Sequence, residues 1–264
     1  MEEYKTLSVK TEKFTMEYLK FGTGSKIMVI LPGLSLCSVI RSARAIVKAY
    51  SVFSKDYTVY LFDRKKEIER GYTVYDMAED SALALKTLKL NGVYLLGVSQ
   101  GGMIAEVLAI RYPELIKKLV LSSTLSRLND TAKKTLFLWG NIAATGDHVK
   151  LNENIFSKIY SKETLDNNKV LLALLKQEGS EEDCKRFVIL ADATNGFDVN
   201  DELDKIKCKT LVIGAENDAV VTGNSSREMA EKLNCDLYMY DKYGHAVYDE
   251  APDFKERVAE FFKD

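Results

Sequence analysis

The feature that most constrains this chain is a short strand that turns through Gly-x-Ser-x-Gly into a helix. Residues 93–96 form a continuous apolar run, which is typical of a buried strand. The run leads into Gly-Val-Ser-Gln-Gly at 97–101, and a helical pattern then continues from Met103 to Arg111. Glycines let the backbones of strand and helix approach where a Cβ would clash. Ser99 is therefore predicted at the carboxyl end of a strand, beside a helix N-terminus that favours developing negative charge.

The length and charge of the chain limit the class of protein. A chain of 264 residues can bury a large core as one α/β domain with an insertion. Its net charge of −2, with acidic and basic residues interspersed, argues against a nucleic-acid partner. Apolar runs such as 27–31 are too short to span a bilayer, and the charged residues 1–13 do not resemble a signal peptide. We therefore predict a cytoplasmic protein with no membrane partner.

Metal and cofactor chemistry is not indicated by the sequence. The cysteines at 37, 184, 208 and 235 are scattered, with no C-x-x-C pair and no neighbouring histidine. No Gly-rich loop matches a phosphate-binding fingerprint. We expect no metal site, no cofactor and no disulfide framework, with the cysteines serving as small packing residues or surface thiols.

Strand-like and helix-like segments alternate up to residue 122. Strands are expected at 4–10, 14–21, 27–31, 58–62, 93–96 and 118–122, and helices at 36–53, 74–89 and 103–111. This alternation predicts a mostly parallel sheet with helices on both faces. Functional groups in such sheets gather at the carboxyl ends of the strands.

The pattern changes between residues 125 and 207, where no strand-like run appears. Helices are predicted there at 131–144, 152–160, 162–176, 181–192 and 199–206, before strands return at 210–214 and 235–240 with helices at 225–233 and 252–263. We interpret 125–207 as a helical cap inserted into a core formed by 1–124 and 208–264. Aromatic residues of the cap could contact substrate, although such residues more often pack between cap and core. They are Phe137, Trp139, Phe156 and Tyr160.

Three polar residues in a defined order predict nucleophilic chemistry. A serine hydroxyl needs an adjacent base, and the base needs an orienting carboxylate. Ser99 is followed along the chain by Asp218, four residues beyond a predicted strand, and by His245, five residues beyond the next. Both loops should open at the sheet edge that carries Ser99.

Other polar residues near these loops leave alternatives. Glu216 and Asp241 could replace Asp218 as the orienting carboxylate. His148, the other of the two histidines in the chain, lies in the predicted cap and could face solvent or contact substrate. Asp63 ends a predicted strand and is expected to hold its loop by hydrogen bonds. Cys37 is expected to pack near the turn that follows residue 31.

The motifs at 97–102, 214–218 and 244–245, in this order, resemble those of the α/β-hydrolase superfamily. The most similar group is the cap-bearing single-domain esterases, lactonases and C–C hydrolases, and the resemblance covers about residues 14–262. It implies an α/β-hydrolase fold, a mostly parallel sheet flanked by helices with an inserted helical cap. It further implies Ser99 as the nucleophile, His245 as general base and then acid, and Asp218 as the residue that orients His245. The oxyanion hole would use the backbone N–H groups of Leu34 and Gln100.

Two stretches depart from the pattern of this superfamily. Many relatives have a histidine before the glycine of the oxyanion turn, where this chain has Pro32. The loop that is usually Gly-rich and contains serine is replaced by the charged residues 65–70. The second difference alters one wall of the expected pocket.

The resemblance implies a serine hydrolase that cleaves a small carboxylic ester or thioester through an acyl-enzyme. Its partner would be a small-molecule acyl substrate. C–C bond hydrolysis, lactone opening and a proton-abstraction lyase reaction are alternatives on the same three residues, and a non-catalytic ligand-binding relative is a further one. Dehalogenases and epoxide hydrolases of this fold are disfavoured because they place Asp where Ser99 stands. The sequence leaves the substrate and the oligomeric state open.

Overall fold

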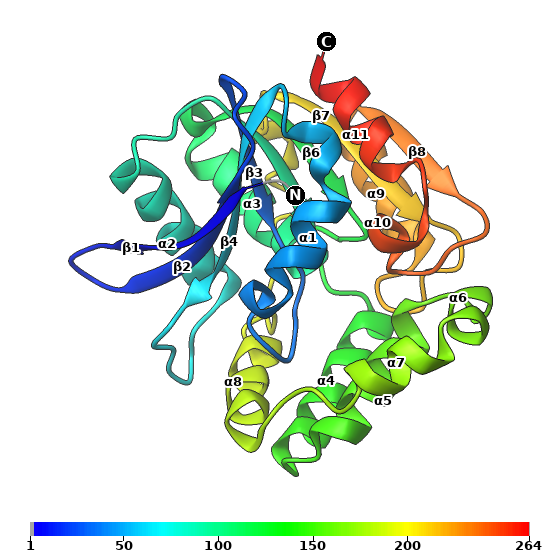
Figure 1. Ribbon diagram of the computed structural model, residues 1–264. Helices are drawn as coiled ribbons and strands as arrows, with labels where there is room; N and C mark the ends of the chain where they lie inside the picture. Colours follow the sequence, from blue (N-terminus) through cyan, green and yellow to red (C-terminus); the bar gives the residue numbers. More distant parts are fainter. Residues whose placement is uncertain (1–2, 264) are drawn as a thin grey trace.

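A single eight-stranded sheet organises the chain (Figure 1). The structure is a computed structural model that describes residues 3–263. The strands are β1 (Tyr4–Lys10), β2 (Thr15–Phe21), β3 (Lys26–Leu31), β4 (Tyr57–Lys65), β5 (Val93–Val98), β6 (Ile116–Ser122), β7 (Lys209–Ala215) and β8 (Asp236–Tyr240). They lie in the order β1-β2-β4-β3-β5-β6-β7-β8. β2 runs antiparallel to both of its neighbours, and the strands from β4 to β8 pair in parallel.

Helices cover both faces of this sheet, so its central strands are mostly apolar. The α-helices of the described residues are α1 (Ala43–Ala49), α2 (Val74–Thr87), α3 (Gln100–Arg111), α4 (Asp130–Ala144), α5 (His148–Ile159), α6 (Lys162–Asn167), α7 (Lys169–Leu175), α8 (Glu181–Asp192), α9 (Gly223–Leu233), α10 (Val247–Glu250) and α11 (Phe254–Lys263). Helices α2, α3 and α9 bury their apolar residues in one cluster with one face of the sheet. Helices α1 and α11 contribute to a second cluster on the other face. Every residue of β5 is buried between them.

The helical insertion follows β6 and precedes β7. Figure 1 shows α4 to α8 gathered at one end of the sheet, apart from the helices that flank it. The predicted fold class, a mostly parallel sheet flanked by helices with an inserted helical region, is confirmed. The division of the chain into a core of 1–124 and 208–264 and a cap of 125–207 stays a prediction.

Several expected helices differ from the structure. The helices expected from Met103 and at 152–160 begin earlier, at Gln100 and His148. Residues 36–53 form α1 between two 3₁₀ turns, Val39–Ser42 and Ser51–Phe53. The helix expected at 162–176 is divided into α6 and α7 at Asn168. The helix expected at 252–263 begins at Phe254, two residues after the proline, and Ala251 before that proline takes an extended conformation (φ −77°, ψ 121°).

The helix expected at 199–206 agrees least with the structure. Only Leu203–Lys205 forms a 3₁₀ turn there. Asp198 forms an isolated antiparallel bridge with Arg127, and the Val199 N–H donates to the Ser126 carbonyl. The long-range contacts hold the start of the segment, and the local hydrogen bonds within it, such as Lys205 N–H to the Glu202 carbonyl, span three residues and do not form an α-helix.

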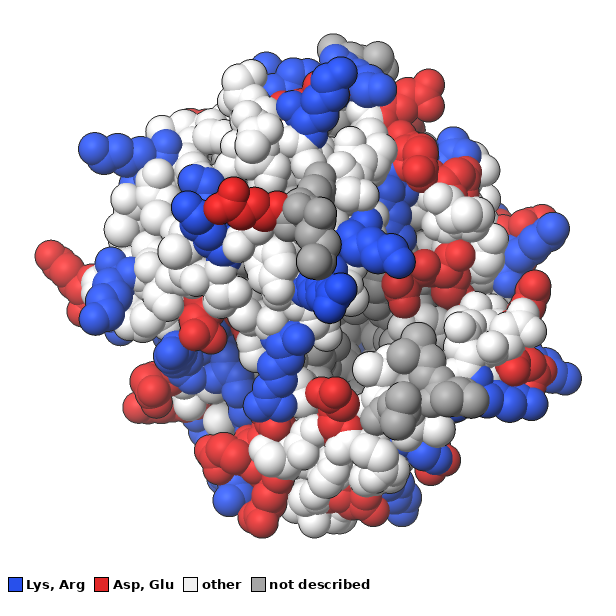
Figure 2. All heavy atoms as spheres, in the orientation of Figure 1, with Lys and Arg blue, Asp and Glu red and all other residues white. Residues whose placement is uncertain are grey.

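The surface carries both signs of charge. Figure 2 shows Lys and Arg side chains interspersed with Asp and Glu across the viewed face. No helix within residues 3–263 combines the length and the apolar character that crossing a membrane requires.

Glu106 of α3 is an ionisable residue on the buried side of a helix that packs against the sheet. Its side chain is fully buried, and neither carboxyl oxygen has a hydrogen-bond partner among the described residues. Burial raises the pKa of this carboxyl well above its usual range. The folded state therefore retains a proton that the unfolded chain releases above about pH 4.3, so stability must fall as pH rises through that value.

We expect Glu106→Gln to remove this pH-dependent loss, because an amide of the same shape does not titrate. At pH 8 the variant should gain about 1–3 kcal/mol in free energy of unfolding over the parent, and at pH 4.5 much less. Urea denaturation at the two pH values measures the difference. Glu231→Gln, at an exposed position of α9, is the control and should change neither value. An equal effect of Glu106→Gln at both pH values would contradict the interpretation.

Candidate active site

The turn from β5 into α3 holds Ser99 in a conformation that non-glycine residues rarely adopt. Ser99 has φ 53° and ψ −122°. The Ser99 N–H donates to the Ser122 carbonyl of β6 (2.9 Å), and the Thr124 hydroxyl donates to the Ser99 carbonyl (2.8 Å). Contacts on both sides of the residue thus hold its strained backbone in place.

The glycines of this turn allow a close approach of three backbone segments. A Cβ added to Gly97 would lie 2.7 Å from the Gly101 carbonyl oxygen. A Cβ added to Gly101 would lie 2.0 Å from the Leu31 carbonyl oxygen at the end of β3. Any side chain at either position would separate α3 from the sheet.

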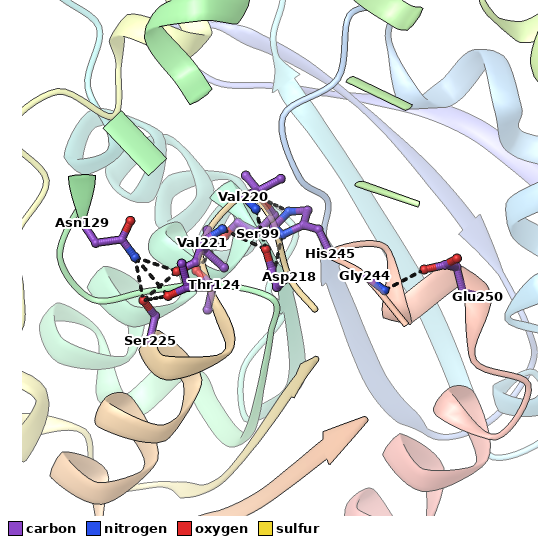
Figure 3. A network of polar contacts seen from close by, with 11 residues as sticks. Ser99, Thr124, Asn129, Asp218, Val220, Val221, Ser225, Gly244, His245 and Glu250 are labelled. Atoms are coloured by element: carbon purple, nitrogen blue, oxygen red, sulfur yellow. Dashed lines mark hydrogen bonds and ion pairs between the residues drawn. The ribbon is translucent and has the colours of Figure 1, made fainter. Parts of the chain in front are cut away.

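The structure brings the three predicted residues into one hydrogen-bonded chain (Figure 3). The Ser99 Oγ lies 3.0 Å from the His245 Nε2, and the His245 Nδ1 lies 2.8 Å from the Asp218 Oδ2. His245 follows β8 and Asp218 follows β7, so the two loops meet at the edge where β5 ends. The His245 and Asp218 side chains are 4% and 2% exposed, which shields their hydrogen bond from water.

Asp218 is held as an anion by three neighbouring donors. Burial acts to raise its pKa, but the His245 ring and the backbone N–H groups of Val221 and Val220 outweigh burial and lower the pKa below its usual value. Both N–H groups donate to the Asp218 Oδ1 over 2.8 Å, leaving Oδ2 for the ring. An ionised Asp218 requires a donor, so the proton of a neutral His245 stands on Nδ1 and its Nε2 accepts from Ser99.

The alternative carboxylates and the second histidine lie elsewhere. Glu216 pairs with Arg227 of α9, and Asp241 is exposed. His148 is half-buried at the first residue of α5 and does not line the cavity beside Ser99. Asp63 was expected to hold its own loop, but it lies within β4, where it accepts hydrogen bonds from the Ser38 hydroxyl and the Arg64 N–H and so ties the segment after β3 to this strand.

The turn after β3 lies against the nucleophile candidate. A Cβ added to Gly33 would stand 3.1 Å from the Ser99 Cβ and 3.7 Å from its Oγ. Leu34 and Gln100 both line the cavity that contains Ser99 and His245. Gln100 is the first residue of α3, so its N–H has no acceptor within the helix.

The cavity beside Ser99 has a volume of about 40 Å³ and apolar walls. Of the four aromatic residues predicted to contact substrate, only Trp139 lines it. Tyr160 lines a second cavity of about 660 Å³, which shares Gly33 and Tyr248 with the first. Phe156 packs half-buried against the core, 6.1 Å from the Tyr160 ring.

The expectation for Phe137 was wrong, because this side chain is 73% exposed and lines neither cavity. Ala132, Leu136 and Trp139 follow one another on α4 at spacings of four and three residues and form its inward face. Phe137 lies one residue beyond Leu136 and points away. The lining residues of the insertion that sequence reasoning missed are Ala132, Leu136, Ile155, Ile159 and Thr194. Apolar helical periodicity could have suggested the first four.

The insertion also holds the loop that carries His245. The Ala246 N–H donates to the Ile159 carbonyl at the end of α5 (2.8 Å). The Glu250 carboxylate accepts from the Gly244 N–H (3.1 Å) and from the Ser161 hydroxyl that caps α6 (2.6 Å). Figure 3 shows Glu250 reaching Gly244 beside the histidine. Both neighbours of His245 are therefore tied to the insertion.

Comparison with known proteins places this arrangement in a family. A model of the alpha/beta hydrolase fold matches residues 26–252. The chain belongs to the α/β hydrolase family. No group of three or more His, Cys, Asp or Glu side chains within the described part of this hydrolase is arranged to hold a metal ion.

Individual relatives are distant in sequence. The hydrolase is 26% identical to pyrrolizixenacetamide deacetylase of Xenorhabdus hominickii, over 79% of each chain. It is 27% identical to a 2-hydroxy-6-oxononadienedioate/2-hydroxy-6-oxononatrienedioate hydrolase of Burkholderia vietnamiensis, over 68% of this chain and 65% of that one. Among solved structures, it resembles the α/β hydrolase MGS-M2 from a Medee basin deep-sea metagenome library, with 26% identity, 98% of both chains covered and a TM-score of 0.86.

We expect Asp218→Asn to destabilise the fold at neutral pH, because the amide is a weaker acceptor for three N–H donors. The loss in free energy of unfolding should be about 1–3 kcal/mol at pH 7. Because the folded pKa of Asp218 is lowered, its contribution is present above about pH 3.9 and is lost as pH falls through the folded value. Urea denaturation of the parent and the variant at pH 7 and pH 3.5 measures the difference in free energy of unfolding at each pH. Asp241→Asn is the matched control, and a comparable loss in that variant would contradict the assignment.

Proposed function

We propose that this hydrolase cleaves a small carboxylic ester or thioester through an acyl-enzyme on Ser99. The observation that carries the proposal is the unbroken hydrogen-bonded chain from the Ser99 hydroxyl through His245 to the ionised Asp218. A buried carboxylate that accepts from Nδ1 leaves Nε2 free to take the serine proton. The three residues follow one another along the chain as Ser, Asp and His, which is the order in enzymes of this fold.

The reaction follows from these positions. Ser99 Oγ attacks the carbonyl carbon as its proton passes to His245 Nε2, and the imidazolium that forms is stabilised by Asp218. The negative charge on the carbonyl oxygen is met by the N–H groups of Leu34 and Gln100, each such donor lowering the barrier by about 3 kcal/mol. His245 then protonates the leaving oxygen or sulfur. In the second half, His245 removes a proton from water, which attacks the acyl-enzyme; as the bond from the acyl carbon to Ser99 Oγ breaks, His245 returns that proton to Oγ and the acid is released.

The two cavities offer separate places for the acyl chain and the leaving group of the substrate. The cavity of about 40 Å³ beside Ser99 has room for roughly three water-sized groups, which suits a short acyl chain. The cavity of about 660 Å³, which shares Gly33 and Tyr248 with the smaller one, would take the leaving group. The relative from Xenorhabdus hominickii is named as a deacetylase, and an acetyl group is such a short acyl chain. We therefore favour a short acyl group on a larger alcohol or thiol.

Ser99→Ala is expected to abolish covalent labelling by a fluorophosphonate, because this reagent reacts with a serine that a neighbouring base activates. Intact-protein mass spectrometry should show one adduct on the parent and none on the variant. Ser157→Ala, at an exposed position of α5, is the control and should label like the parent. Labelling that survives Ser99→Ala would refute the proposed nucleophile.

The parent should hydrolyse p-nitrophenyl acetate with a kcat/KM about tenfold or more above that for the octanoate, because the cavity wall excludes the longer chain. Leu136→Ala should enlarge the cavity and raise the octanoate-to-acetate ratio. Phe137→Ala, one residue along the same helix but exposed, should leave the ratio unchanged. A preference for octanoate in the parent would contradict the assignment of the small cavity to the acyl group.

A further inference from the structure

Behind the proposed oxyanion hole lies a buried arginine that the reaction described above does not use. Arg64, the penultimate residue of β4, is 7% exposed. It makes no ion pair with any carboxylate of residues 3–263, and its Nε is buried without a hydrogen-bond partner among them. Burial lowers its pKa, although neighbouring Asp63 favours the charged form. A buried, unpaired cation is costly, so its remaining contacts are informative.

Those contacts join the two segments that would supply the oxyanion donors. Arg64 Nη2 donates to the Pro32 carbonyl (2.8 Å) and to the Gln100 Oε1 (3.3 Å). Pro32 belongs to the turn that carries Leu34, and Gln100 opens α3. One nitrogen atom therefore bridges the oxyanion turn and the helix that begins after Ser99.

The Pro32 carbonyl is a necessary anchor for this turn. Proline has no N–H, so its carbonyl is the one backbone group through which residue 32 can be held by a hydrogen bond. The same oxygen would lie 2.5 Å from a Cβ at Gly101, so the turn and α3 already touch there. A small rotation of the Pro32–Gly33 peptide would redirect the Leu34 N–H that follows.

The Gln100 side chain extends the connection to the insertion. Its Nε2 donates to the Leu190 carbonyl of α8 (2.7 Å), while its Oε1 accepts from Arg64. Gln100 is 2% exposed, so both contacts are shielded from water. The chain of contacts runs from β4 through the first residue of α3 to the inserted helices.

We propose that Arg64 is a positioning residue, which sets the distance between the Leu34 and Gln100 N–H groups by bridging Pro32 and the Gln100 side chain. This inference rests on the proposed acyl-transfer reaction. The bridge acts on the transition state, where both donors must reach one oxygen, more than on substrate binding. Arginine suits the place because its planar guanidinium holds a fixed direction at each nitrogen, which a lysine ammonium does not.

The test compares Arg64→Met and Arg64→Lys with the parent, after active sites are counted by stoichiometric fluorophosphonate labelling. In Arg64→Met, kcat per labelled site for p-nitrophenyl acetate should fall about 10- to 100-fold, with KM changed by less than about threefold. The pH profile of kcat/KM should keep its position, since His245 and Asp218 are untouched. Arg64→Lys keeps the charge and should retain an intermediate kcat. Arg111→Met, which removes an exposed arginine from the end of α3, should match the parent.

Gln100→Met provides a second route that leaves the buried arginine in place and keeps the backbone N–H of residue 100. It should lower kcat in the same manner. In the double variant with Arg64→Met, the fold-decrease in kcat should be smaller than the product of the two fold-decreases in the single variants. A kcat per labelled site within twofold of the parent in Arg64→Met would overturn the inference. If Arg64→Met does not fold, a kcat per labelled site within twofold of the parent in Gln100→Met would overturn the inference. A parent protein that fails to label at Ser99 would refute the proposed function instead.

Discussion

The strained backbone of Ser99 is the constraint on which the rest of the site depends. A positive φ of 53° at a serine is tolerated only where the surroundings hold it, at a cost of about 1–3 kcal/mol. Here Ser122 at the end of β6 and Thr124 in the loop after it supply those surroundings. Because Gly97 and Gly101 permit contact closer than any side chain allows, the hydroxyl is carried clear of the sheet and toward the loops after β7 and β8.

The insertion is part of the site as well as a cover for it. It supplies part of the apolar wall of the cavity beside Ser99, and it holds the loop of His245 through Ile159 and Ser161. Through Leu190 it also reaches the Gln100 side chain. A change in the packing of these helices would therefore shift both the His245 imidazole and the first turn of α3. The shape of the pocket is in this way coupled to the geometry of the reacting groups.

Much of the architecture could be predicted from local patterns. Buried parallel strands are continuous apolar runs, and β3, β5, β6 and β7 stand within a few residues of their expected bounds. The segment at 199–206 could not be predicted in this way, because its first residue, Val199, donates to Ser126, far away in the sequence, and the preceding Asp198 forms a bridge with Arg127. Phe137 was misplaced for a related reason. Aromatic character indicates burial but not which face of a helix meets the core.

The sequence by itself determined the strand–turn–helix at Ser99 and the order in which Asp218 and His245 follow it, because both depend on local chemistry and on spacing from recognisable strands. Only the tertiary structure decided that Asp218, rather than Asp241 or Glu216, reaches the imidazole. It alone placed Arg64 against Pro32 and Gln100. The physical reason is that these contacts join side chains from different strands and loops, whose distances depend on how the whole sheet and its insertion pack.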